Sequence, residues 1–124
     1  MRRILTAATG ALALTLTLTA YAGEARAHAS LVTATPAADA VAAAPREVML
    51  TFTERLDPSF STVEVRAASG ERVDRQDVRV DAADARCLRV SLPALPPGVY
   101  RVIWKSVAVD MHVKTGEFVF HVAP

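Results

Sequence analysis

The chain has one cysteine in 124 residues, Cys87, and therefore has no partner for an internal disulfide. Cys87 lies in an apolar stretch, residues 87–92, in which Leu88, Val90 and Leu92 share the opposite face. No metal-binding or catalytic motif surrounds it, and it lies too far downstream to be the lipid-carrying cysteine of a lipoprotein signal. We expect Cys87 to be a partly buried free thiol.

The sequence also lacks the signatures of several function classes. It has no G-x-S-x-G turn, no phosphate-binding glycine loop and no nucleophile with a neighbouring base, which argues against a hydrolase. It has no basic patch or arginine run of the kind that binds nucleic acid. After residue 27 no apolar run is long enough to cross a membrane. Binding or structural roles remain.

The first 27 residues have the pattern of a secretory signal. Arg2 and Arg3 give a positive start, an apolar run follows, and Ala25-Arg26-Ala27 supplies the small-x-small pattern of a cleavage site. We predict a cleaved signal peptide over 1–27, one domain over 28–124 and a periplasmic, extracytoplasmic location, without membrane insertion after cleavage. Retention of the segment as an N-terminal anchor is the alternative. Residues 28–124 keep 11 of the 14 basic and 12 of the 13 acidic side chains, so this domain is near neutral.

Period-two patterning dominates residues 28–124, with proline and glycine turn signals between the apolar segments. This pattern predicts an all-β fold, an Ig-like β-sandwich or Greek-key β-barrel of about seven strands. The alanine-rich segment 37–44, between Pro36 and Pro45, is predicted to be a surface loop with at most one helical turn. The expected strands are Ser30–Thr35, Glu47–Thr53, Thr62–Ala67, Asp77–Val80, Arg86–Leu92, Gly98–Val107 and Glu117–Val122.

Cleavage after Ala27 would make His28 the first residue of the mature protein. Its free α-amine and its imidazole could then close a chelate ring on one metal ion, which an internal histidine cannot do. A second candidate pair, Asp110 and His112, is separated by one residue. On an extended segment both side chains would share a face, and Met111 would point to the opposite face, toward the core.

These donors favour copper in the Cu(II) state. An amine, two imidazoles and a carboxylate form a set of three nitrogens and one oxygen, and tetragonal coordination by nitrogen and oxygen suits Cu(II). Thioether ligands would favour Cu(I), but Met49 and Met111 are the only methionines after residue 27 and do not form a methionine-rich loop.

Several segments together resemble the CopC family of periplasmic copper-resistance proteins. They cover nearly the whole of the predicted domain in order, and they are His28–Val32 with Thr35–Ala37, Pro45–Val48, Leu50–Glu54, Pro97–Trp104, Ser106–Asp110 with His112, Gly116, and Phe118–Phe120. The resemblance implies an Ig-like barrel that binds one Cu(II) through the amine and ring of His28, the carboxylate of Asp110 and the imidazole of His112. It implies an auxiliary role near the metal for Glu54, and a CopD-type inner-membrane copper transporter as partner.

Two positions depart from the family pattern. Many members have glycine or threonine between the aspartate and the histidine, where this chain has Met111, and proline is frequent where this chain has Val113. The ligand types are kept, so we expect copper binding to survive with altered loop geometry. The family's methionine-rich Cu(I) loop has no counterpart here.

Two other functions fit parts of the pattern. An N-terminal histidine with a second histidine also resembles the histidine brace of copper monooxygenases, but Asp110 would fill a position that oxygen chemistry needs open. The chain could also be an Ig-like structural or assembly module whose histidines bind no metal. We expect a copper carrier, with binding and not catalysis as its activity.

Overall fold

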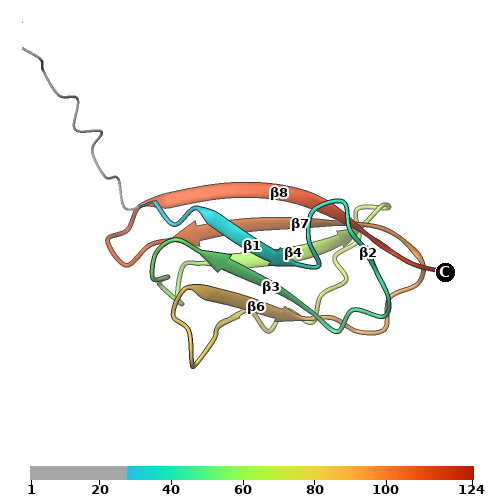
Figure 1. The fold of residues 1–124 in the computed structure, drawn as a ribbon, viewed down its shortest axis with the longest axis horizontal. Helices are drawn as coiled ribbons and strands as arrows, with labels where there is room; N and C mark the ends of the chain where they lie inside the picture. The colour runs from blue at the N-terminus through green and yellow to red at the C-terminus, as the bar shows by residue number, and fades with distance from the viewer. Residues whose placement is uncertain (1–27) are drawn as a thin grey trace, which may run out of the picture.

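The computed structural model describes residues 28–124, and the predicted signal peptide lies outside the described residues. The described chain contains no helix, and so none that could cross a membrane. Its eight strands form two four-stranded sheets, ordered β1-β3-β6-β5 and β2-β8-β7-β4 (Figure 1). The strands are β1 (Leu31–Thr35), β2 (Val41–Ala42), β3 (Glu47–Phe52), β4 (Thr62–Ala67), β5 (Arg79–Val80), β6 (Cys87–Ser91), β7 (Gly98–Val107) and β8 (Val113–Val122). The predicted all-β fold is confirmed.

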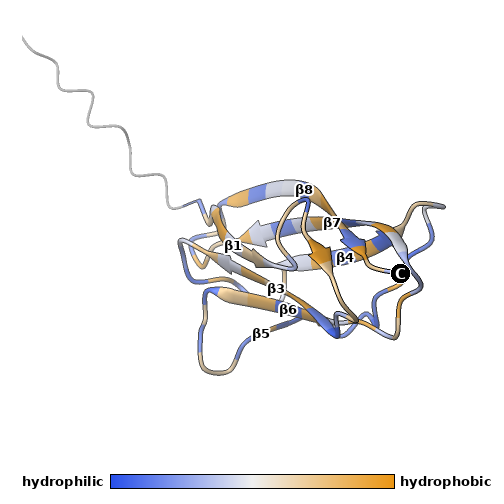
Figure 2. Cartoon of the chain, turned by 45° about the vertical axis from the view of Figure 1, so that its right-hand side comes forward, coloured by the Kyte–Doolittle hydropathy of each residue, from blue (hydrophilic) through white to orange (hydrophobic). Residues whose placement is uncertain are grey.

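The alternation of buried and open positions in the strands builds the core between the two sheets. In β3, Val48, Leu50 and Phe52 are buried, whereas the residues between them are half-buried. In β7, Tyr100 and Trp104 are both buried, as expected for residues four apart on one strand. The Trp104 ring meets the edge of Phe52 across the two sheets, with centroids 5.2 Å apart. Figure 2 shows hydrophilic and hydrophobic residues interspersed along β7 and β8.

The fold differs from the sequence-based expectation in two elements. The segment predicted to be a loop contains β2, which pairs in parallel with His121 and Val122 of β8. Strand β8 begins at Val113, four residues before the expected start at Glu117. Residues 113–115 are exposed and show no apolar alternation, but each pairs with a residue of β7, so the partner strand determines where β8 begins.

Three segments far apart in the sequence meet at one end of the sandwich. Residues 28–30 lead into β1, residues 53 and 54 follow β3, and residues 108–112 join β7 to β8. Leu31 pairs with Phe52, which sets residues 28–30 beside residues 53 and 54, and the isolated bridge between Leu56 and Ala108 brings the loop 108–112 to the same place. Figure 1 shows the start of β1 near the loop between β7 and β8, far from the C-terminus.

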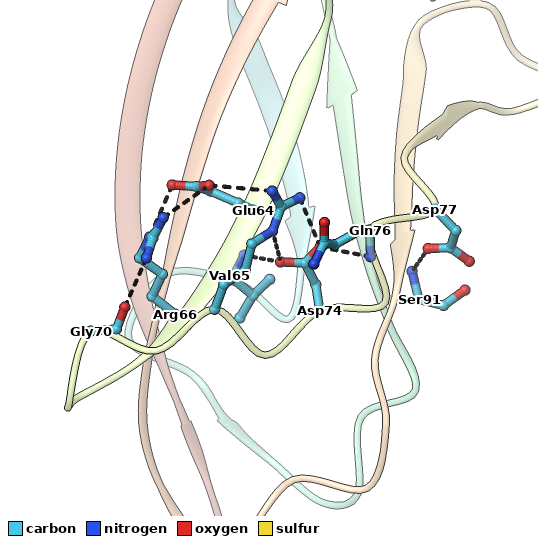
Figure 3. A network of polar contacts seen from close by, with 9 residues as sticks. Glu64, Val65, Arg66, Gly70, Asp74, Gln76, Asp77 and Ser91 are labelled. Carbon is cyan, nitrogen blue, oxygen red and sulfur yellow. Dashed lines mark hydrogen bonds and ion pairs between the residues drawn. The ribbon is translucent and has the colours of Figure 1, made fainter.

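A buried carboxylate organises the connection between β4 and β5 (Figure 3). The Asp74 side chain has no exposed surface; its oxygens accept N–H bonds from Val65 at 2.9 Å and Gln76 at 3.0 Å, and pair with Arg72 Nε at 2.9 Å. Burial alone would favour the neutral acid, but the hydrogen bonds from Arg72, Val65 and Gln76 outweigh it and lower the pKa of Asp74. The charged carboxylate therefore stabilises this connection.

Candidate metal centre

The loop between β7 and β8 is a tight turn and not the extended segment expected from the sequence. The N–H of Met111 donates to the Ala108 carbonyl at 2.8 Å, and the N–H of Ala108 donates to the His112 carbonyl at 2.9 Å. Met111 has a φ of 70°, in the left-handed region. This is the arrangement of a type I turn closed by a left-handed residue, a frequent hairpin connection.

This turn overturns the expectation that Met111 points into the core. The side chain of Met111 is 55% exposed, and those of Val109 and Val113 are 62% and 51% exposed. A residue in the left-handed region interrupts the extended backbone, so side chains on either side of it no longer alternate between the two faces of a strand. The alternation that would bury Met111 is therefore absent. The loop thus presents apolar side chains to solvent on either side of Asp110 and His112.

Asp110 and His112 contact each other within this loop. Oδ2 of Asp110 lies 3.1 Å from Nδ1 of His112, and Oδ1 accepts the backbone N–H of His112 at 3.2 Å. A carboxylate beside Nδ1 favours the proton on that nitrogen and leaves the lone pair of Nε2 free. The pair is half exposed, so its donor atoms are open to an ion arriving from solvent.

His28 lies against this pair although 84 residues separate it from His112 in the sequence. The two imidazole rings are stacked, with centroids 5.0 Å apart and planes inclined by 16°. His28 is half-buried, and its carbonyl accepts a hydrogen bond from Thr53 Oγ1 at 3.1 Å. The fold therefore brings three of the four residues named from the sequence to one place.

The fourth residue, Glu54, lies on the neighbouring segment. Leu56 forms an isolated antiparallel bridge with Ala108, and the N–H of Val109 donates to the Arg55 carbonyl at 3.1 Å. These contacts hold the segment after β3 against the start of the loop, and Glu54 immediately precedes Arg55. Glu54 is half-buried, beside the loop that carries the other candidate ligands.

The side chains alone do not form a closed metal site. Within residues 28–124, no three histidine, cysteine, aspartate or glutamate side chains are close enough to hold an ion together. Two nearly parallel imidazoles also cannot direct their nitrogens at one point, so one ring must turn before both bind the same ion. The donor types fit copper, and an α-amine at His28 would add the missing nitrogen. Assembly of the site would therefore depend on cleavage before His28.

Cys87 and His121 lie outside this centre. Cys87, expected to be a partly buried free thiol, is buried and lies opposite Thr51 of β3 in register. His121 lies at the opposite end of β8 from His112, where it pairs with Val99 of β7.

The residues that hold the N-terminal segment in place are not among those named from the sequence. Thr53 Oγ1 accepts the N–H of Ser30 at 3.0 Å, and Ser106 Oγ donates to the carbonyl of Ala29 at 2.6 Å. The signal for Ser106 was a polar residue at an inward position of β7. Nothing in the spacing of Thr53 distinguishes it from an ordinary strand-end threonine.

These features define a class of protein, a small β-sandwich with a histidine–carboxylate pair and a second histidine at one end. A family model described as the CopC domain matches residues 31–123. The chain belongs to the CopC domain family, which confirms the resemblance noted in the sequence.

Individual relatives agree with this assignment. Protein YobA of Escherichia coli K12 is 36% identical over 98 residues, covering 77% of this chain and 79% of the relative. Copper resistance protein C of Escherichia coli is 33% identical over 106 residues, covering 79% and 83%. Copper transport protein CutJ of Bacillus subtilis is 30% identical over 98 residues, covering 77% of this chain but 18% of the relative. The crystal structure of CopC from Methylosinus trichosporium OB3b superposes with a TM-score of 0.73 at 31% identity, covering 78% of this chain and 95% of that one.

Proposed function

We propose that this protein binds one Cu(II) ion per chain in the periplasm and buffers copper there or passes it on. Relatives named for copper resistance and copper transport support copper as the cargo. The proposal depends on one observation, the stacking of His28 on His112 at 5.0 Å beside Asp110. This contact brings two imidazoles from opposite ends of the domain together beside a carboxylate, and these donor types suit Cu(II).

Each residue of the centre would have a distinct part in binding. His28, once freed by cleavage after Ala27, would chelate through its amine and one ring nitrogen. His112 would bind through Nε2, because Asp110 lies against its Nδ1. Asp110 would turn away from Nδ1 of His112 to add a carboxylate oxygen, because an oxygen held against Nδ1 cannot reach an ion bound at Nε2 of the same ring. Glu54 would act as an auxiliary acceptor beside the site. Copper would be held and released, and no bond of a substrate would be broken.

The proposed partner is a CopD-type inner-membrane copper transporter. In CutJ the region similar to this chain makes up 18% of a longer protein named for copper transport, so there a domain of this kind is part of a larger chain. A separate chain of the same family, such as this one, would instead pass copper to the transporter by docking on it. The exposed Val109, Met111 and Val113 around the candidate centre offer apolar contact area for that docking.

The direct test is a Cu(II) titration followed by EPR on a chain that begins at His28, beside the same chain with one glycine in front. We expect one equivalent to bind in a nitrogen-rich tetragonal site in the first protein and a lost or altered spectrum in the second. Equal spectra from both proteins would show that His28 does not anchor the ion.

A matched pair of histidine variants separates the centre from the rest of the surface. His112→Ala removes one imidazole and should weaken Cu(II) binding by at least about tenfold, the effect of roughly 1.4 kcal/mol. His121→Ala removes an imidazole from the far end of β8 and should leave the affinity unchanged. Equal losses in the two variants would contradict the assigned site.

A further inference from the structure

The N-terminal segment before β1 is anchored inside the protein. Ala29 has no exposed surface, although it is the second residue of the described chain. A buried carbonyl needs a hydrogen-bond donor, and within residues 28–124 the donor recorded for the Ala29 carbonyl is the hydroxyl of Ser106, at 2.6 Å. Ser106 is itself fully buried. One side chain of β7 therefore satisfies the backbone of the segment that carries His28.

Ser106 interrupts an otherwise apolar row. The inward positions of β7 before it are Tyr100, Val102 and Trp104, all buried, and Ala108 follows in the loop. An aliphatic side chain at position 106 would continue this row, but it would leave the Ala29 carbonyl without its donor. The Ser106 hydroxyl can therefore hold the N-terminal segment by a hydrogen bond, whereas an aliphatic side chain at position 106 could only pack in the core.

Three longer hydrogen bonds, made by the side chains of Thr53 and Lys114, fix the direction in which the segment runs. Thr53 Oγ1 donates to the carbonyl of His28 at 3.1 Å and accepts the N–H of Ser30 at 3.0 Å. Lys114 Nζ donates to Ser30 Oγ at 3.0 Å. Thr53 follows β3 in one sheet, and Lys114 pairs with Ser106 in the other. Residues 28–30 therefore bridge the open end between the two sheets.

We propose that Ser106 is a positioning residue for the copper site, because its buried hydroxyl holds the N-terminal segment so that His28 lies against His112. This inference depends on the proposed function. Ser106 would not touch the ion. It raises the fraction of molecules in which the His28 nitrogens and the loop 108–112 are already together, and apparent affinity falls in proportion when that fraction falls.

The test compares two serine variants in the chain that begins at His28. Ser106→Ala removes only the hydroxyl oxygen. Ser61→Ala is the matched control, because Ser61 is also buried and bonds the backbone of Val107, at 3.0 and 3.2 Å, without contact to residues 28–30. Cu(II) affinity is measured by competition with a chelator, and hydrogen exchange of the Ser30 amide is measured in the copper-free proteins.

We expect Ser106→Ala to weaken Cu(II) binding by about tenfold, the usual effect of one lost hydrogen bond to a buried group, and to speed exchange at Ser30. Ser61→Ala should lower the unfolding midpoint while leaving the affinity and the Ser30 exchange unchanged. This contrast separates positioning from a general loss of stability, since both variants remove one buried hydroxyl.

Three results would overturn the inference. Unchanged Cu(II) affinity in Ser106→Ala would show that the hydroxyl serves packing alone, and the proposed function would still stand. Equal weakening in Ser61→Ala would show that stability, and not position, controls the affinity. Absence of Cu(II) binding by the unaltered protein would contradict the proposed function and this inference together.

Discussion

At the scale of single residues, the backbone of Met111 determines the shape of the candidate centre. Its φ of 70° closes the turn that sets Asp110 Oδ2 against His112 Nδ1. Residues with a Cβ enter the left-handed region at a cost of about 1–2 kcal/mol, a cost that glycine does not have. Met111 therefore holds a conformation that a glycine at this position would adopt without strain.

This strain predicts that Met111→Gly stabilises the protein. The relief of about 1–2 kcal/mol is partly offset by the greater freedom of glycine in the unfolded chain, about 0.5–1 kcal/mol, so we expect a net gain of about 0.5–1 kcal/mol. Urea unfolding of the copper-free protein measures this gain in the free energy of unfolding. Met111→Ala is the control, because alanine keeps the Cβ and should bring no such gain. A loss of stability in Met111→Gly would mean that the exposed side chain contributes more than its conformation costs.

The residue types of the candidate centre could be named from the sequence, but their arrangement could not. His28, Asp110 and His112 were found because a cleavage signal and a D-x-H pair are local patterns. The turn at Met111 was missed because a non-glycine residue gives no sign of a positive φ. The role of Ser106 was missed because its partner, the Ala29 carbonyl, is 77 residues away and becomes a neighbour only in the fold.

At the scale of elements, the strand bounds predicted from the sequence were right where buried and exposed residues alternate. They were wrong where a strand forms only because a neighbouring strand pairs with it. Strand β4 has the bounds expected from the sequence, and β7 does too, because their inward residues recur at every second position and, apart from Ser106 of β7, are apolar. Strand β2 has two residues, too few for any period to show. The first residues of β8 are exposed and are held by β7. Their strand conformation depends on a partner that the local sequence does not reveal.

The pairing of β7 with β8 also explains why position 116 has no side chain. Gly116 lies opposite Trp104 in register, and a Cβ there would come within 2.3 Å of Trp104 Cζ2. Gly116→Ala should therefore displace the indole ring and cost about 1–3 kcal/mol or more, as overpacking does. Thermal unfolding measures the cost, and the fluorescence of Trp104, the one tryptophan of the chain, reports the displaced ring.

Gly70→Ala provides the matched comparison. A Cβ at Gly70 meets nothing within 4 Å, and only its φ of 88° resists the substitution. This variant should lose some stability without any change in tryptophan emission. Similar emission shifts in both variants would contradict a specific contact between position 116 and Trp104.

At the scale of the whole molecule, the candidate centre lies at one end of the sandwich. The connection between β4 and β5 is stabilised by charged carboxylates. Asp74 and Asp77 both have lowered pKa values; for Asp77 the causes are hydrogen bonds from the hydroxyl and the N–H of Ser91. A carboxylate with a lowered folded pKa stabilises the protein at pH values above its unfolded pKa, about 3.9, and loses that contribution as the pH falls through the folded pKa. Acid should therefore weaken this region.

The acid dependence can be assigned to Asp74 with one variant. Asp74→Asn keeps the shape but removes the charge and one of the two acceptor oxygens, so it should be less stable than the unaltered protein at pH 7. The difference should shrink as the pH falls below about 4, because Asp74 of the unaltered protein then binds a proton more readily in the unfolded chain than in the folded protein. Urea unfolding of both proteins between pH 7 and pH 2.5 measures this, with Asp84→Asn as an exposed control. A difference that stays constant with pH would show that the charge of Asp74 does not stabilise the fold.

Strand β8 separates the two ends of the molecule. Its ten residues, Val113–Val122, start beside His112 and end two residues before Pro124. At about 3.4 Å per residue, this carries the C-terminus roughly 30 Å from the candidate centre. A purification tag, a fluorophore or a sensor-chip linker attached after Pro124 would leave the histidine end open to solution. The same attachment ahead of His28 would convert the α-amine that the proposed cleavage after Ala27 exposes into an amide.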